Sequence, residues 1–454
     1  MPRGVIWKSK YGDNNCSNNM MSNKRRQIGY AYSPEYTKLA DLLPSNIGRA
    51  SLVDDLIRSH DLIAQCDDII SPCFASKDQL TAYHDSKFIS YLLNEEDVTY
   101  SDSEDESDGS AHSSLPNEDV DRRLQERFGL EFDCPEFDGL DKYIQAISGT
   151  TIACARYLTS RNANNDKQQV AINWHGGRHH ARKDKCSGFC YVNDIVLGIL
   201  ELRKRFETVM YIDLDLHHGD GVETAFAYSN KVLTLSVHRY DRGFFPGSGN
   251  SKFCGKGRGQ NYTINVGLRA GLNDTSLRRI LRDVIRPAFE RFQPGAVVLQ
   301  CGADGLARDP TKEWNLSIRG LSSVILDIID FGKPTLVVGG GGYNHLDAAR
   351  LWCLVLGELL VGKEVTEKWD MIPEGSNFIH KYVDDGYAYF PDEVRRIDDL
   401  NLKDDFLDRV VECTNVQIAK IDPVLAYYRE SIFLKQNINA QTFYTLTHTT
   451  NMHQ

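Results

Sequence analysis

The sequence predicts one large α/β domain built on a mostly parallel sheet with helices on both faces. Apolar, β-branched runs of strand length recur along the chain, and each is followed by glycine or polar residues. Runs that are apolar almost throughout fit strands buried on both faces of a parallel sheet. Several alternate with segments of helical periodicity, which is the pattern of an α/β domain. In such a sheet, functional side chains collect at the carboxyl ends of the strands.

Six apolar runs are the predicted strands. They are VAINW at 170–174, TVMYIDLDL at 208–216, KVLTLSVH at 231–238, YTINVGL at 262–268, AVVLQCG at 296–302 and TLVVGGG at 335–341. Helical periodicity lies between several of these runs, at 194–206, 277–292 and 321–332. The chain of 454 residues, 41% hydrophobic and 25% charged, has the composition of a globular protein with a large core.

The ends of the chain and one internal stretch differ from this pattern. We expect residues 1–27 to be a flexible segment, 28–400 to form the domain, and 401–454 to be a C-terminal extension whose role is open. Residues 94–120 are rich in Ser, Asp and Glu, so we predict a disordered acidic insertion there. It is a solvated loop, a kinase-addressed segment or a lure for basic substrates; the candidate phosphorylation sites are Ser101, Ser103 and Ser107.

Charge and cysteine content indicate which kinds of partner and which cellular compartment to expect. The net charge of −11 argues against nucleic acid binding through the overall field and favours a basic partner. An odd number of cysteines, 11, without zinc-finger spacing, indicates a reducing compartment. The N-terminus lacks a signal peptide's apolar region, and no apolar run reaches 18 residues. We therefore expect no membrane association and a location in the nucleus, the cytoplasm or both.

The strongest chemical signal is VMYIDLDLHHGDG at 209–221. In an extended strand, Asp213, Asp215 and His217 point to the same side. Carboxylates inside an apolar strand need partners or a cation, which makes Asp215 and His217 candidate metal ligands with Asp213 behind them. Asp304 ends another predicted strand and is the candidate third ligand. Three ligands leave room for water, as in catalytic sites, and nitrogen and oxygen donors fit Zn²⁺ but also Fe²⁺ or Co²⁺.

A pair of histidines follows a third strand, in GGRHHARKD. Adjacent imidazoles can divide the work of proton transfer if each meets a different environment, so His179 and His180 are candidates for a base and its partner. Asp213 and Asp220 are the candidate carboxylates that orient them. Tyr343 follows four glycines, which let the backbone approach a ligand closely, and a tyrosine there suits oxyanion stabilisation.

These motifs resemble the zinc-dependent histone deacetylases of class I, and within them the histone deacetylase 8 branch. The matching motifs are HHARKDKCSGFCYVNDIVLGILEL, YIDLDLHHGDGVETAF, VLTLSVHRYDRGFFPGSG, QCGAD and GGGGYN, preceded by YSPEY, GRASLVDDLI and FDCPEFDG in the family's order. The resemblance covers about residues 28–93 and 124–395. It implies the arginase/deacetylase fold and hydrolysis of acetyl or other acyl groups from the N6-amine of lysine, in histones or other proteins. Such an enzyme would regulate chromatin and repress transcription.

The resemblance also implies roles for individual residues. Asp215, His217 and Asp304 would bind zinc, His180 would be the general base and then acid, His179 its electrostatic partner, and Tyr343 the donor to the substrate carbonyl. Asp213 would be hydrogen-bonded to His179, and Asp220 to His180. The tunnel for the acyl-lysine would be lined by Gly188, Phe189 and Phe245. Asp133 would lie at the rim, and Arg49 at an inner cavity that handles acetate. Two structural potassium sites are also implied. The first would use Asp213, Asp215, His217, Ser236 and Val237, and the second would use Phe226, Ser229, Val232 and Tyr262.

Two positions depart from the family pattern. Arg178 stands before the histidine pair, where the branch more often has a bulky apolar or aromatic residue, which puts the charge of the inner cavity and the acyl preference in question. Thr311 falls near a rim position where Met or Leu is common.

Three other functions share part of these features. They are deacetylation of acetylated polyamines or other small amides on the same fold, arginase-like hydrolysis at a paired manganese site, and a catalytically idle scaffold. The resemblance favours acetylated lysine peptides or proteins such as histone tails as partners, inhibition by hydroxamates, and a monomeric catalytic chain without direct nucleic acid binding.

Overall fold

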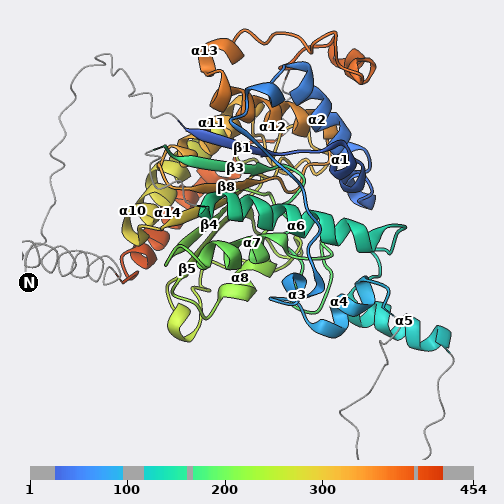
Figure 1. Cartoon of the computed structure of the whole chain (residues 1–454). Helices are drawn as coiled ribbons and strands as arrows, with labels where there is room; N and C mark the ends of the chain where they lie inside the picture. Colours follow the sequence, from blue (N-terminus) through green and yellow to red (C-terminus); the bar gives the residue numbers. More distant parts are fainter. Residues whose placement is uncertain (1–25, 96–116, 161–166, 393–396, 423–454) are drawn as a thin grey trace, which may run out of the picture.

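The computed structural model describes residues 26–95, 117–160, 167–392 and 397–422, which form one α/β domain around an all-parallel sheet (Figure 1). Within these residues the sheet has the order β2-β1-β3-β8-β7-β4-β5-β6. The strands are β1 (Gln27–Ala31), β2 (Asp68–Ile70), β3 (Gln169–Asn173), β4 (Val209–Asp213), β5 (Val232–Arg239), β6 (Thr263–Leu268), β7 (Ala296–Gln300) and β8 (Thr335–Val338). The predicted fold class is confirmed.

Helices cover both faces of the sheet (Figure 1). One layer holds α6 (Leu140–Thr159), α7 (Asp194–Arg203) and α8 (Asp220–Phe226), with α1 (Pro34–Ala40), α3 (Lys77–Leu80), α4 (Ser86–Leu92) and α5 (Asn117–Phe128) around α6. The other holds α2 (Arg49–Ser59), α9 (Asp274–Ile280), α10 (Arg286–Phe292), α11 (Ile318–Ile329), α12 (His345–Leu360) and α14 (Phe406–Ile418), and α13 (Lys363–Thr366) follows α12. Short 3-10 helices span Pro44–Asn46, Ile63–Gln65, Gly257–Gly259, Ile379–Asp385 and Leu400–Asp405.

Strand β4 shows why the apolar runs are continuous. Met210 and Ile212 belong to the core cluster that includes residues of α2, α11 and α12, whereas Val209 and Tyr211 belong to the cluster that includes residues of α6 and α7. Successive side chains of a strand point to opposite faces, so a strand covered on both sides needs apolar residues at every position. The polar Asp213 stands at the end of this run.

The central strands end earlier than predicted. β4 stops at Asp213, so Asp215 and His217 lie in the following loop and not on a strand. Side-chain oxygens interrupt the ladder: Asp213 accepts from the backbone N–H of Asp215 at 3.1 Å, and Asp215 from that of His217 at 3.0 Å. Aspartate side chains that bond nearby backbone groups favour turns over strands. The expected alternation along one strand was therefore wrong.

Two further elements differ from the sequence prediction. The helix expected at 277–292 is divided by a π-helical turn, Leu281–Ile285, between α9 and α10. Pro287 has no N–H to donate to the preceding turn, which breaks the α-helical ladder at this point. Strands β1 and β2 were not predicted, because β1 (QIGYA) contains Gln and Gly and is not a continuous apolar run, and β2 has three residues, two of which are exposed.

The first part of the expected C-terminal extension packs on the domain. In α14, Leu407 and Ile418 are buried, and Asn415 donates from its side chain to the Asp283 carbonyl at 3.0 Å. The expected N-terminal segment lies almost wholly outside the described residues, as do Ser101, Ser103, Ser107, most of the acidic insertion and everything after residue 422. No helix among the described residues is long and apolar enough to cross a membrane.

Candidate active site

The candidate site lies where four neighbouring strands of the sheet end. β3, β8, β7 and β4 are adjacent and parallel, so their carboxyl ends meet at one edge. The loop after β3 carries the histidine pair, the loop after β4 carries Asp215 and His217, the loop after β7 carries Asp304, and the loop after β8 carries Tyr343. The sheet thus brings together residues that are far apart in the sequence.

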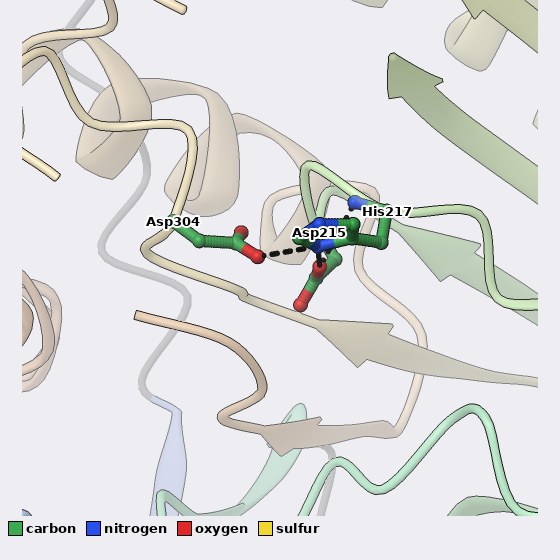
Figure 2. A group of neighbouring side chains, drawn as sticks. All are labelled: Asp215, His217 and Asp304. Carbon is green, nitrogen blue, oxygen red and sulfur yellow. Dashed lines mark hydrogen bonds and ion pairs between the residues drawn. The ribbon is translucent and has the colours of Figure 1, made fainter. Parts of the chain in front are cut away.

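The three predicted metal ligands converge (Figure 2). Their potential ligand atoms all lie within 4.8 Å of one another. His217 Nδ1 lies 2.9 Å from Asp304 Oδ2 and 3.4 Å from Asp215 Oδ1. Ligand atoms of a tetrahedral zinc are roughly 3.3 Å apart, because each lies about 2.0 Å from the metal. The spacing therefore fits a metal of this size.

The surroundings of the two carboxylates also fit a cation. Asp215 and Asp304 are both buried. Burial raises the pKa of Asp304, and the neighbouring Asp215 carboxylate raises it further. A bound cation relieves the repulsion between two such groups. Glycines make room for them: a Cβ on Gly302 would lie 2.2 Å from Asp215 Oδ2, and one on Gly341 would lie 2.3 Å from Asp304 Oδ2.

The histidine pair beside the trio is bonded to two separate carboxylates. His179 Nδ1 lies 2.9 Å from Asp213 Oδ2, and His180 Nδ1 lies 2.7 Å from Asp220 Oδ1. Burial alone lowers the pKa of His179, but Asp213 and Asp215 raise it to about 9. Burial and the neighbouring His179 lower the pKa of His180 to about 4. At neutral pH the first imidazole is therefore charged and the second neutral.

Three aromatic side chains and one glycine surround this polar centre. The Phe245 ring is 5.0 Å from that of His180, and the Phe189 ring is 5.8 Å from that of Tyr343. Gly188 has φ +54, and a Cβ on it would lie 2.4 Å from His180 Cδ2. Its backbone N–H donates to Asp133 Oδ2 at 2.8 Å. Asp133, expected at the rim, thus holds the loop that carries Gly188 and Phe189.

A narrow pocket lies between the histidine pair, the loop of Gly188 and Phe189, and the glycine-rich loop after β8, whereas Phe245, His217 and Asp304 are not among the residues that line it. Its walls are Asn46, Gly177, Arg178, His179, His180, Gly188, Phe189, Cys190, Asp215, Gly340, Gly341 and Tyr343. Burial raises the pKa of Tyr343 well above its usual range, so the hydroxyl stays protonated and can donate. Arg49 lies directly behind the glycine-rich loop, where Nη1 donates to the carbonyls of Gly340 and Gly342, both at 3.0 Å.

The residues of the two expected potassium sites lie on or beside β4 and β5. Asp213 is the register partner of Ser236, and the adjacent Val237 is fully buried. For the second expected site, the N–H of Ser229 donates to the Phe226 carbonyl at 2.8 Å. The Tyr262 carbonyl accepts from Thr234 on β5, the strand that begins at Val232.

The family model for the histone deacetylase domain matches residues 43–359. The chain is 38% identical to histone deacetylase 8 of Xenopus tropicalis over 340 residues, 75% of this chain and 85% of that protein. It is also 38% identical to histone deacetylase clr6 of Schizosaccharomyces pombe over 335 residues, 73% and 75% of the two chains. Histone deacetylase 9 of Arabidopsis thaliana is 46% identical over 277 residues, 61% and 62% of the chains.

The chain belongs to the histone deacetylase family. The resemblance predicted from the motifs is confirmed, and the protein is a metal-dependent hydrolase of the lysine deacetylase class.

Sequence reasoning missed several residues that hold the deacetylase site in place. Gln300 donates to Asp215 Oδ2 at 2.7 Å, and Asp309 accepts from the backbone N–H of Tyr343 at 2.8 Å. Asp194 accepts from the backbone N–H groups of Gly177 and Arg178 at 3.0 and 2.7 Å. A glutamine ending the apolar run AVVLQ was a usable signal for the first of these. For Asp309 no local pattern points to its partner.

Proposed function

We propose that this deacetylase uses zinc, held by Asp215, His217 and Asp304, to remove acetyl groups from the N6-amine of lysine in proteins. One observation carries the proposal: two histidines, each hydrogen-bonded to its own carboxylate, lie side by side next to three converging metal ligands and a tyrosine. Fe²⁺ and Co²⁺ suit the same donors. When bound, the metal supplies Lewis acidity that polarises the amide carbonyl and lowers the pKa of water.

The side chains divide the remaining work. Asp220 occupies His180 Nδ1, which leaves Nε2 of the neutral ring to take a proton from the attacking water and pass it to the leaving amine. The positive charge of His179, maintained by Asp213, stabilises negative charge developing nearby. The Tyr343 hydroxyl donates to the substrate carbonyl oxygen. Gly188, Phe189 and Phe245 enclose the aliphatic stem of the lysine, and Asp133 orients the loop at the entrance.

We further propose acetylated histone tails and similar lysine peptides as substrates, in the nucleus, the cytoplasm or both, with transcriptional repression as the consequence. The net charge of −11 suits a basic peptide partner and disfavours direct nucleic acid binding. Potassium at the two expected sites would stabilise the loops after β4 and before β5. A monomeric catalytic chain remains the proposed state.

Hydrolysis of an acetyl-lysine peptide by the zinc-loaded protein tests the proposal. We expect acetate release, inhibition by a hydroxamate, and loss of turnover in His180→Ala with the metal still bound. Acetylspermidine in the same assay distinguishes a polyamine deacetylase. Absence of turnover on the peptide by a folded, metal-loaded protein would contradict the proposed function.

A further inference from the structure

Arg178 places a positive charge at the inner wall of the active-site pocket. The side chain is 95% buried, since 5% of its surface is exposed, and it lines the same pocket as His180, Asp215 and Tyr343. One of its terminal nitrogens donates to the His175 carbonyl at 3.0 Å. Its Nε is buried without a hydrogen-bond partner. A buried guanidinium with unused donors is costly unless an anion meets it.

Arg49 adds a second guanidinium behind the same wall. Its two hydrogen bonds go to the carbonyls of Gly340 and Gly342, which are neutral acceptors. Burial, followed by repulsion from Arg178, lowers the pKa of Arg49 to about 9, so both side chains are charged at neutral pH. Within the described parts of the chain, no carboxylate accepts a hydrogen bond from either guanidinium.

Within the described residues, the acidic groups around Arg178 favour its charged form but do not hydrogen-bond its guanidinium. Burial lowers the pKa of Arg178, but Tyr143, Cys190 and Asp194 raise it by more. Tyr143 and Cys190 are uncharged at neutral pH, because burial raises the pKa of each to about 12. The Asp194 carboxylate is already bonded to the hydroxyl of Thr151 and to the backbone of Gly177 and Arg178. The Tyr143 hydroxyl is itself buried without a partner and can donate.

We propose that Arg178, with Arg49 and Tyr143, forms a carboxylate-binding site at the inner end of the pocket that selects acyl-lysines whose acyl group ends in a carboxylate, such as malonyl- or succinyl-lysine. The inference rests on the proposed deacylation and extends its substrate class. Water attacks the acyl carbon, the C–N bond breaks, the lysine amine takes the proton, and the product is a dicarboxylate. The acetate released from acetyl-lysine has the same chemistry and can bind the same donors.

The decisive comparison uses acyl groups that differ only in charge. kcat/KM is measured for succinyl- against succinamoyl-lysine and for malonyl- against malonamoyl-lysine, with acetyl-lysine as reference. In the wild type we expect the carboxylate to be favoured over the amide by at least about tenfold, since a charge-assisted hydrogen bond is worth about that factor or more. Arg178→Leu should abolish the preference, which is read as the carboxylate-to-amide ratio of kcat/KM within the same variant and so does not depend on its overall rate. Arg178→Lys should retain part of it.

Controls separate charge from folding and from the proposed function. Arg205→Leu removes one exposed positive charge elsewhere and should leave every ratio unchanged. Arg178→Leu should melt at the wild-type temperature or above, because an apolar side chain replaces a buried charge to which no carboxylate is hydrogen-bonded. Acetate and malonate, against chloride at equal ionic strength, should raise the melting temperature of the wild type more than that of Arg178→Leu, a readout that needs no turnover.

The possible results distinguish failure of the proposed function from failure of the carboxylate site. If acetyl-lysine is not hydrolysed but the anions stabilise only the wild type, the proposed function fails and the carboxylate site stands. Inhibition of acetyl-lysine hydrolysis by added acetate is measured for both proteins. If acyl ratios are unchanged by Arg178→Leu but acetate inhibits this variant about tenfold more weakly than the wild type, the site serves the product alone, and the substrate preference is overturned. If neither the ratios, the inhibition nor the anion-dependent melting changes, the site itself is overturned.

Discussion

The rings of His179 and His180 lie 3.9 Å apart between centroids, yet they differ in charge at neutral pH. The difference arises because Asp213 and Asp215 favour the protonated form of His179, which in turn disfavours protonation of its neighbour. Two adjacent imidazoles can thus hold opposite protonation states in one site.

This pairing predicts a broad plateau in the pH profile. Turnover needs His180 neutral and His179 protonated, so activity should fall as the pH drops toward about 4, and again as it rises past about 9. The measurement is log kcat/KM against pH on an acetyl-lysine peptide. An acidic limb near the ordinary histidine value of about 6.5 would contradict the assignment of His180 as the base.

Asp213→Asn should move one limb only. Without this carboxylate the pKa of His179 loses its first supporting charge, so the alkaline limb should shift to lower pH. Asp220→Asn is the matched comparison: it removes the partner of His180 and should lower the rate, but it should move the alkaline limb less, because Asp220 raises the pKa of His179 less than Asp213 does. Equal profiles for the two variants would show that the carboxylates do not act on separate histidines.

Tyr343→Phe should lose on the order of 10²-fold or more in kcat, which is the usual effect of removing one oxyanion donor. The phenyl ring keeps its contact with Phe189, and the backbone bond to Asp309 is unaffected. Elemental analysis should therefore find metal at the wild-type level. Near-wild-type turnover would remove the hydroxyl from the mechanism.

Metal removal should abolish turnover and lower the melting temperature. The buried carboxylates of Asp215 and Asp304 repel each other without a cation, and a ligand that binds only the folded state stabilises it. We expect one equivalent of metal per chain in the wild type and none in Asp304→Ala. Two equivalents at a shared site would favour the arginase-like alternative.

Gly188→Ala should cost far more activity than a similar change at another glycine. The new Cβ would meet His180 at 2.4 Å, whereas a Cβ on Gly243, also at positive φ, meets nothing within 4 Å. Both variants lose roughly 1–2 kcal/mol to the left-handed backbone. Only Gly188→Ala displaces the base, so comparing kcat with melting temperature separates the two effects.

The sequence predicted the chemistry of the site more accurately than its backbone. Asp215, His217 and Asp304 were identified as a converging trio because apolar runs ended at polar residues, and parallel strands end at one edge. Their local geometry was wrong, since a strand was extended past Asp213 where side-chain oxygens capture the backbone N–H groups. Local periodicity contains no information about such bonds.

Long-range positioning contacts were beyond sequence reasoning for a related reason. Asp309 and Tyr343 are separated by more than thirty residues, and only the packing of the loops after β7 and β8 brings them together. Arg178 was recognised as a departure, but its unpaired state became evident only when Asp194 proved to be occupied by other donors.

The position of β8 has a consequence for biosynthesis. β8 lies between β3 and β7, although it follows both in the chain. During translation the ribosome releases Asp215, His217 and Asp304 before this central strand exists, and β3 and β7 then have unpaired edges. Tyr343 arrives with the strand that closes the gap. A nascent chain therefore completes its catalytic residues in the same step that pairs the facing edges of β3 and β7. A chain interrupted before residue 335 lacks Tyr343 and leaves both of these edges unpaired.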